Sequence, residues 1–153
     1  MEKKQRTLNN KGFSLIELIV VIAIMAILVG VLAPNVLKYV EKSRISADTQ
    51  VADTVRTAVL TTLLDPDPTI QAAKPTAAVS DTDIASDAAK INGADAFSKA
   101  VQDMMGGTPT EIKKKLKSGM YKGQDILLSF DPTTGKVSVE IKSKDGKSSI
   151  KIE

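Results

Sequence analysis

The sequence predicts an α+β fold, in which a long N-terminal α-helix packs on a small C-terminal three-stranded antiparallel sheet. Three observations predict this class. Residues 13–33 form an almost wholly apolar run. An amphipathic pattern with helical spacing continues that run to residue 64. Near the C-terminus, apolar and polar residues alternate on both sides of Asp145-Gly146, a pair typical of β-hairpin turns.

The composition limits the classes of function. A chain of 153 residues has room for one domain and an anchoring segment. It contains no His and no Cys, which excludes His-dependent catalytic triads and the usual zinc ligand sets. No motif indicates carboxylate or lysine catalysis either. We therefore expect no enzyme activity, no cofactor and no metal.

The positive charge of the chain belongs to its first residues. Residues 1–12 carry Lys3, Lys4, Arg6 and Lys11 against Glu2 alone. Without them the 21 basic and 18 acidic side chains fall to 17 of each. A basic tip before an apolar span is typical of a cytoplasmic flank. The folded part is not expected to bind nucleic acid.

The apolar run is long enough to cross a membrane. A helix of 21 residues reaches roughly 31 Å. A secretory signal peptide is one interpretation, but its apolar region is typically about 7–15 residues long. A plain signal anchor is another, and it leaves the carboxylate of Glu17 unexplained. A third is a short leader ending at Gly12, whose removal makes the apolar segment a new N-terminus.

The junction favours the third interpretation. Lys11-Gly12-Phe13-Ser14-Leu15-Ile16-Glu17 resembles the processing motif of type IV prepilins and of type II secretion pseudopilins. Their leaders are basic and end in Gly, and Phe, a small hydroxyl residue, two aliphatic residues and Glu follow. Pro34 also falls where pilins commonly carry a proline. The resemblance covers about residues 3–64 and implies a pilin-like fold.

The resemblance implies a processing pathway. A membrane-embedded prepilin peptidase cuts between Gly12 and Phe13, and the same enzyme methylates the new Phe13 amine. Gly12 suits this site because a side chain there would obstruct the peptidase. In a pilin-like filament, the partner of Glu17 is the Phe13 amine of a neighbouring subunit.

Elementary electrostatics supports this role for Glu17. A charged carboxylate inside a bilayer segment costs about 2.5–3.5 kcal/mol on insertion scales, and such residues usually face a partner. The apolar run contains no cation. Cleavage creates one, because an α-amino group is charged near neutral pH.

The helix is expected to continue beyond the membrane. Residues 13–34 form the transmembrane or filament-core part and residues 35–64 the amphipathic part, between a leader at 1–12 and a head at 65–153. The helix ends at "LLDPDP", since a proline disfavours helix at the preceding residue. Gly30 and Pro34 weaken the helix between its halves. The two residues predict that the helix either unwinds locally near residues 30–34 in the filament or is only kinked there.

The first part of the head is expected to be irregular. Residues 65–95 predict a long loop, in which Asp81, Asp83 and Asp87 cap turns rather than bind calcium, because the spacing lacks the glycine and terminal glutamate of a calcium loop. Residues 94–105 predict a helix with inward-facing Phe97, Val101, Met104 and Met105. A second helix follows, with Thr110 as its cap and a solvated face of Lys113, Lys114, Lys115 and Lys117.

The C-terminal residues predict an antiparallel meander. A turn at Asp145-Gly146 pairs Ile141 with Ile150 and Val139 with Ile152 on one face, and Glu140 with Lys151 on the other. The stretch "DPTTG" supplies the earlier turn. One face of this sheet needs an apolar cover, which residues 47–63 of the long helix supply.

The leading functional hypothesis is a structural subunit of a type IV pilus-like surface filament. The resemblance implies a homo-oligomeric helical filament, with prepilin peptidase, a membrane assembly platform and membrane lipid as the other partners. The subunit is single-pass in the inner or cytoplasmic membrane before assembly, with its leader cytoplasmic. A major pseudopilin of a secretion or competence system is one alternative. A membrane-anchored binding module that does not polymerise is the other.

Overall fold

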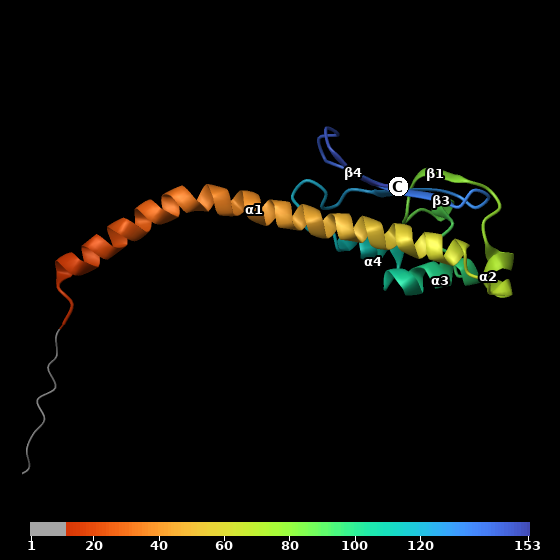
Figure 1. Cartoon of the computed structure of the whole chain (residues 1–153), viewed down its shortest axis with the longest axis horizontal. Helices are drawn as coiled ribbons and strands as arrows, with labels where there is room; N and C mark the ends of the chain where they lie inside the picture. The colour runs from red at the N-terminus through yellow and green to blue at the C-terminus, as the bar shows by residue number, and fades with distance from the viewer. Residues whose placement is uncertain (1–11) are drawn as a thin grey trace, which may run out of the picture. The chain divides into compact units, whose positions relative to one another are not determined.

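A computed structural model describes residues 12–153, and the leader prediction for residues 1–11 lies outside them (Figure 1). The described chain divides into a unit that ends at Tyr39 and a unit of residues Val40–Glu153. Helix α1, Leu15–Leu63, contributes residues to both. The first unit is helical and apolar, and the second holds every other helix and strand of the described residues.

Helix α1 includes both Gly30 and Pro34. It begins two residues later than predicted, because Ser14 caps its first turn, and it ends at Leu63, before the prolines at 66 and 68. A proline in a helix interior removes one backbone hydrogen bond and disfavours the turn before it. A break at Gly30 and Pro34 inside a filament stays a prediction.

The second unit has four strands, not the predicted three. They are β1 (Val79–Asp83), β2 (Ile126–Asp131), β3 (Lys136–Lys142) and β4 (Ser149–Ile152), all antiparallel and in the order β1-β2-β3-β4. The predicted register of the last hairpin is confirmed, with Ile141 opposite Ile150 and Glu140 opposite Lys151. The stretch "DPTTG" forms the turn between β2 and β3, where the Gly135 N–H donates to the Asp131 carbonyl.

Strand β1 lies inside the segment predicted to be a loop. Its residues are mostly small or acidic, so no apolar alternation marks it. Tertiary pairing with β2 makes it a strand, and the register shifts between Val79 and Thr82. Asp81 sits at this irregularity with a positive φ of 42° and accepts a hydrogen bond from the Ser129 hydroxyl. Asp81 and Asp83 therefore lie in a strand rather than in a loop.

One face of the sheet carries the core of the second unit. Leu128, Val139 and Ile141 are fully buried there, whereas the residues between them are half-buried or exposed. Val55 and Val59 of α1 have no exposed surface, which confirms the predicted cover. The ring of Phe97 in helix α3 (Ala96–Met105) lies 6.4 Å from that of Phe130 in β2, so α3 joins the same core.

Short helices complete the second unit beside α1 (Figure 1). Helix α2 (Pro68–Ala73) and the 3-10 helix η1 (Asp87–Ala89) lie in the predicted loop. Helix α3 (Ala96–Met105) buries Phe97, Val101 and Met105 as predicted, but Met104 is 48% exposed. Helix α4 (Pro109–Lys114) is capped by Thr108 rather than Thr110, since Glu111 closes a capping box with Thr108.

The last hairpin closes through a wider loop than the predicted two-residue turn. The paired ladder ends at Lys142 and Ser149, and the Ser143 N–H donates to the Ser148 carbonyl at 2.8 Å. Within the loop, the Gly146 N–H donates to the Ser143 carbonyl, and Gly146 has a φ of 67°. The register survives because this loop is symmetric about Asp145-Gly146.

Several turns of the second unit depend on ionised carboxylates. The pKa values of four carboxyl groups are lowered, and the largest cause in each case is a hydrogen bond from a hydroxyl or backbone N–H of the adjacent cap or turn. They are Asp67, Glu111, Asp131 and Asp145. Their stabilising effect is present above the unfolded pKa values of 3.8 and 4.5 and is lost as the pH falls through the folded values.

This predicts acid destabilisation of the second unit. The free energy of unfolding of the full chain in micelles, measured by denaturant titration, is expected to fall as the pH is lowered from about 5 to about 3. An Asp131→Asn variant is expected to show a smaller fall than the unaltered chain. A free energy that stays constant over this range would contradict the prediction.

Candidate functional site

The candidate site is the start of α1, where the polar residues form a helix cap. The Ser14 backbone N–H donates to Glu17 Oε2 at 2.8 Å, and the Ile16 N–H donates to the Ser14 hydroxyl at 3.4 Å. The Leu18 N–H closes the first helical turn on the Ser14 carbonyl. The carboxylate of Glu17 thus lies at the positive end of the helix dipole, where negative charge is stabilising.

The cap changes the interpretation of Glu17. The prediction treated it as a carboxylate without a partner in its own segment, but Oε2 has one in Ser14. The spacing Ser-x-x-Glu at 14–17 is a capping-box pattern, so the sequence carried this signal. The other oxygen, Oε1, makes no hydrogen bond within residues 12–153. Glu17 therefore keeps one oxygen for a group outside the described chain.

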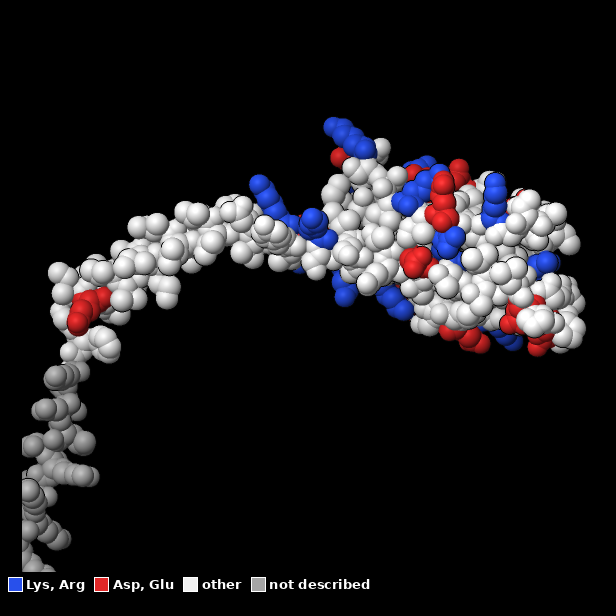
Figure 2. Space-filling model, viewed as in Figure 1, with Lys and Arg blue, Asp and Glu red and all other residues white. Residues whose placement is uncertain are grey.

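The surroundings of Glu17 are apolar and uncovered. Phe13 is 92% exposed, and the side chains of Ile16, Leu18, Val20 and Val21 form a shallow depression with Phe13 and Glu17. Glu17 is the only acidic residue between residues 12 and 40, and Figure 2 shows this segment as an almost wholly white surface. Helix α1 is long and apolar enough to cross a membrane, and its most apolar window is wholly exposed.

The predicted processing residues lie directly before this cap. Gly12 and Phe13 are exposed and precede α1, and no atom lies within 4 Å of a Cβ added at Gly12. Within the described chain, a larger side chain at position 12 would therefore meet no steric clash. Lys11 and the rest of the predicted leader lie outside the described residues.

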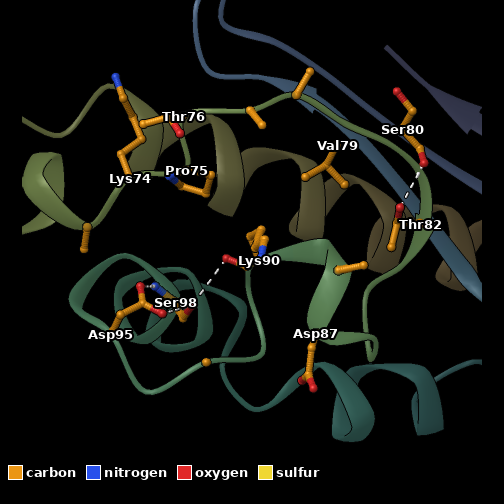
Figure 3. A pocket seen from close by; sticks show the side chains of 15 residues that line it. Lys74, Pro75, Thr76, Val79, Ser80, Thr82, Asp87, Lys90, Asp95 and Ser98 are labelled. Carbon is orange, nitrogen blue, oxygen red and sulfur yellow. Dashed lines mark hydrogen bonds between the residues drawn. The ribbon is translucent and has the colours of Figure 1, made fainter.

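The largest depression of the second unit lies between the α2–β1 connection, η1 and α3 (Figure 3). Some of its polar groups bond to one another. The Ser98 hydroxyl donates to Asp95 Oδ2 at 2.7 Å, and the Thr82 hydroxyl donates to the Ser80 carbonyl. Burial opposes ionisation of Asp95, but the hydrogen bonds from Ser98 outweigh it and lower the pKa of this carboxyl. Asp95 and Ser98 in this depression therefore act as the cap of α3.

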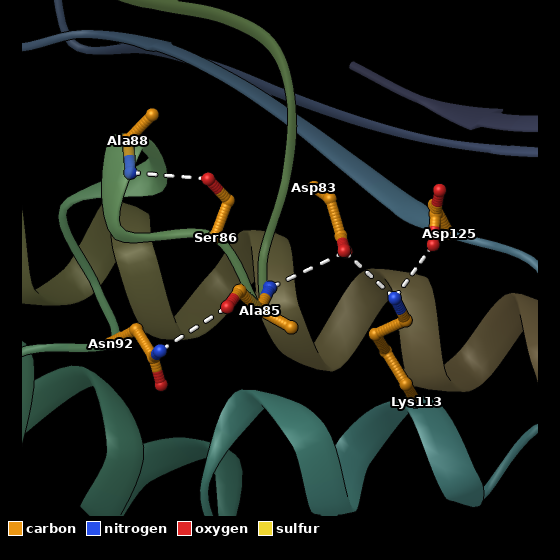
Figure 4. A network of polar contacts seen from close by, with 7 residues as sticks. All are labelled: Asp83, Ala85, Ser86, Ala88, Asn92, Lys113 and Asp125. Carbon is orange, nitrogen blue, oxygen red and sulfur yellow. Dashed lines mark hydrogen bonds and ion pairs between the residues drawn. The ribbon is translucent and has the colours of Figure 1, made fainter.

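A second polar cluster joins α4 to the sheet (Figure 4). The Lys113 ammonium lies 2.8 Å from Asp83 Oδ2 and 2.6 Å from Asp125 Oδ1. Burial lowers the pKa of Lys113, but the hydrogen bonds to both carboxylates outweigh that effect and raise it. Lys113 is therefore a cross-link between elements rather than part of a solvated face. Among residues 12–153, no three His, Cys, Asp or Glu side chains are placed to hold a metal ion.

A buried carboxylate anchors the connection between α4 and β2. Asp48, an acidic residue in the amphipathic part of α1, is fully buried. Its Oδ1 accepts a hydrogen bond from the Lys117 N–H at 2.7 Å, and its Oδ2 accepts one from the Ser118 N–H at 3.0 Å. About two helical turns earlier, Glu41 Oε1 accepts one from the Gly119 N–H at 2.7 Å. No local pattern marks Asp48, because its donors lie about 70 residues away.

Comparisons with known proteins bear on the N-terminal part of the chain. Residues 7–33 match the family model described as the prokaryotic N-terminal methylation motif. Two type IV major fimbrial proteins FimA of Dichelobacter nodosus are 42% identical over 55 residues, which are 36% of this chain. The chain spans about a third of the length of these curated relatives, 35% and 34%. No solved structure matches the chain.

The matched motif includes Gly12, Phe13, Ser14 and Glu17, the residues that form the cap and its approach. The fimbrial relatives share with this chain a stretch twice as long as that motif. Both comparisons support the resemblance of this chain to type IV pilins.

Proposed function

We propose that this chain is a structural subunit of a type IV pilus-like surface filament. One observation carries the proposal: an uncovered apolar helix begins within the matched methylation motif, and near its start Glu17 has one carboxylate oxygen without a hydrogen bond to residues 12–153. In this proposal residues 1–12 are the leader, 13–34 the membrane and filament-core helix, 35–64 its amphipathic half and 65–153 the head.

The exposed apolar surface requires a cover. Phe13, Leu15 and Ile16 are 92%, 77% and 68% exposed, and large apolar side chains continue to be exposed as far as Val40. Contiguous apolar patches of this size mark interaction surfaces. Lipid covers this surface while the subunit waits in the inner or cytoplasmic membrane. The apolar helices of other copies replace the lipid in the filament.

Charge pairing sets the position of each added copy. Cleavage after Gly12 leaves an α-amino group on Phe13, which is charged near neutral pH. Glu17 Oε1 is free to accept from the Phe13 amine of a neighbouring copy, while Oε2 keeps its bond to Ser14. An unpaired buried charge is far more costly than a paired one. This difference favours one stagger between subunits over others.

The fimbrial relatives favour a body subunit of a pilus over a pseudopilus. Both are described as major fimbrial proteins, and both share a stretch of 55 residues with this chain. A body subunit also needs the partners that the resemblance implies: prepilin peptidase, a membrane assembly platform, lipid before assembly and further copies of the chain.

Processing at Gly12 is the direct test. The mass of the chain isolated from cell filaments is expected to lack residues 1–12 and to carry one methyl group on Phe13. Gly12→Val is expected to retain the leader, because a side chain there obstructs the peptidase. Gly30→Val is the matched control, since neither glycine has an atom within 4 Å of an added Cβ. Monomers that keep an intact leader would favour the anchored binding module.

A further inference from the structure

Five exposed lysines gather at one end of the second unit. We call Lys42, Lys117, Lys122, Lys144 and Lys147 the lysine cluster. Three segments supply it: the first turn of α1 within this unit, the α4–β2 connection and the β3–β4 hairpin. In Figure 2 the tip of that hairpin is blue with a small red area beside it, whereas red and blue areas alternate at the other end of the unit.

Backbone contacts hold these three segments together. The Gly119 N–H donates to Glu41 Oε1, which joins the α4–β2 connection to α1. The Lys144 N–H donates to the Met120 carbonyl at 3.1 Å, which joins the hairpin to the same connection. The lysines are therefore brought together by the fold and not by the sequence, where they spread over more than 100 residues.

The lysines of the cluster form no ion pairs with carboxylates of the described residues. The nearby acids are engaged elsewhere: Asp48 is buried on backbone N–H groups, and Glu41 accepts from Gly119 and lies 3.7 Å from Arg44. Asp145 accepts hydrogen bonds from the Ser143 hydroxyl and the Lys147 N–H. The cluster is a net positive surface without an internal partner.

Chain connectivity indicates the partner. The second unit begins at Val40, seven residues after the apolar run ends at Ala33. Seven residues span at most about 25 Å, whatever the orientation of the two units. A membrane that holds the apolar run thus keeps the cluster near its headgroups, and such tethering makes weak contacts effective. Lysines near an anionic bilayer surface are attracted to it.

We propose that the lysine cluster docks the head of the membrane-held subunit on anionic lipid headgroups before assembly. The proposal rests on the membrane-anchored state of the proposed function but not on polymerisation. Incorporation into a filament breaks these lipid contacts together with those of the apolar helix. The charge of the bilayer therefore adjusts how readily the subunit leaves the membrane.

The test measures the distance of the head from the headgroups. The chain has no cysteine, so Ser148→Cys places one fluorophore in the exposed hairpin loop, and Thr76→Cys places a control in the α2–β1 connection. The full chain is inserted into vesicles of phosphatidylcholine, with or without phosphatidylglycerol, that contain a headgroup nitroxide quencher. We expect strong quenching at position 148 only with phosphatidylglycerol, weakened by salt, and little quenching at position 76 in either vesicle.

Matched charge variants separate the cluster from general basicity. Lys122, Lys144 and Lys147 changed together to Gln are expected to lower the ratio of docked to undocked heads on the order of 100-fold. Lys90, Lys99 and Lys136 changed together to Gln are exposed controls outside the cluster, and they are expected to leave quenching unchanged.

Three results would overturn the proposal: equal quenching in both vesicles, no quenching at position 148, or full quenching in the cluster variant. If the cluster variant instead loses binding to double-stranded DNA or to a second copy, with no effect of lipid charge, the cluster serves that partner. Because the vesicle assay needs no filaments, its failure leaves the pilus function standing. Absence of filaments with normal docking would overturn the pilus function alone.

Discussion

Glu17→Gln is expected to abolish abundant filaments while the head stays folded. The amide oxygen of Gln still accepts the Ser14 N–H, so the helix cap survives and only the charge is lost. A Phe13 amine buried without its carboxylate costs about 3 kcal/mol, which lowers association on the order of 100-fold per contact. Filament yield by electron microscopy and the circular dichroism of the purified chain measure the two effects separately.

Ser14→Ala is the matched control for capping. It removes the hydroxyl that accepts from Ile16 and keeps the carboxylate of Glu17. Loss of an N-cap hydroxyl costs about 1 kcal/mol of helix stability, so filaments are expected to persist. If Ser14→Ala abolishes filaments and Glu17→Gln does not, capping rather than charge pairing is what assembly requires from this site.

Asp48→Ala is expected to destabilise the second unit by about 3 kcal/mol, because it leaves two buried backbone donors without their charged acceptor. The Lys117 and Ser118 N–H groups lose their bonds to the side chain, and the α4–β2 connection loses its anchor on α1. Denaturant unfolding of the full chain in micelles measures the loss. Hydrogen exchange is expected to accelerate first at residues 117–119.

Asp53→Ala provides the comparison on the same helix. Asp53 is an exposed acid five residues further along α1, and its replacement is expected to change stability by less than about 0.5 kcal/mol. Equal effects of the two substitutions would show that the buried hydrogen bonds of Asp48 contribute nothing beyond the removal of an acid from α1.

The elements that the sequence predicted well have strong local patterns. The register of β3 on β4 followed from apolar alternation, an Asp-Gly pair and the opposite charges of Glu140 and Lys151, which agree on one pairing. The apolar helix followed from its length alone. In both cases the physical cause acts between residues that are close in sequence, so the sequence displays it directly.

The missed elements depend on distant partners or on a signal with two meanings. Strand β1 exists because β2 offers it a pairing edge, and its own residues favour a loop. The stretch LLDPDP predicts a stop after α1, but proline is also favoured at the first position of a helix, and Pro68 begins α2 after its cap Asp67. Thr108 and Thr110 are both suited to cap a helix because threonine is favoured at that position. The side chain of Glu111 accepts from the Thr108 N–H, which makes Thr108 the cap.

The functional features likewise include some that the sequence predicts and some that depend on contacts between distant residues. Gly12, Phe13 and Glu17 form a contiguous motif, which the sequence displays in full. The hydrogen bond between the Ser14 N–H and Glu17 could also be predicted, because Ser-x-x-Glu is a capping-box pattern. The lysine cluster and the anchor at Asp48 could not, because each joins residues about 70 or more positions apart. A polar residue in an amphipathic helix is normally predicted to face solvent. Asp48 is buried instead because the fold brings the Lys117 and Ser118 N–H groups to its carboxylate.

The strand order β1-β2-β3-β4 has a consequence for folding. Strands β2, β3 and β4 each pair with the next strand across a short turn, whereas 42 residues separate the end of β1 at Asp83 from the start of β2 at Ile126. Contacts between nearby segments form faster than distant ones, because less chain entropy is lost in closing them. The core face of α1, with Val55 and Val59, is synthesised before any strand. The meander β2-β3-β4 can therefore form first on a surface already present, and β1 then joins its open edge across the longer connection.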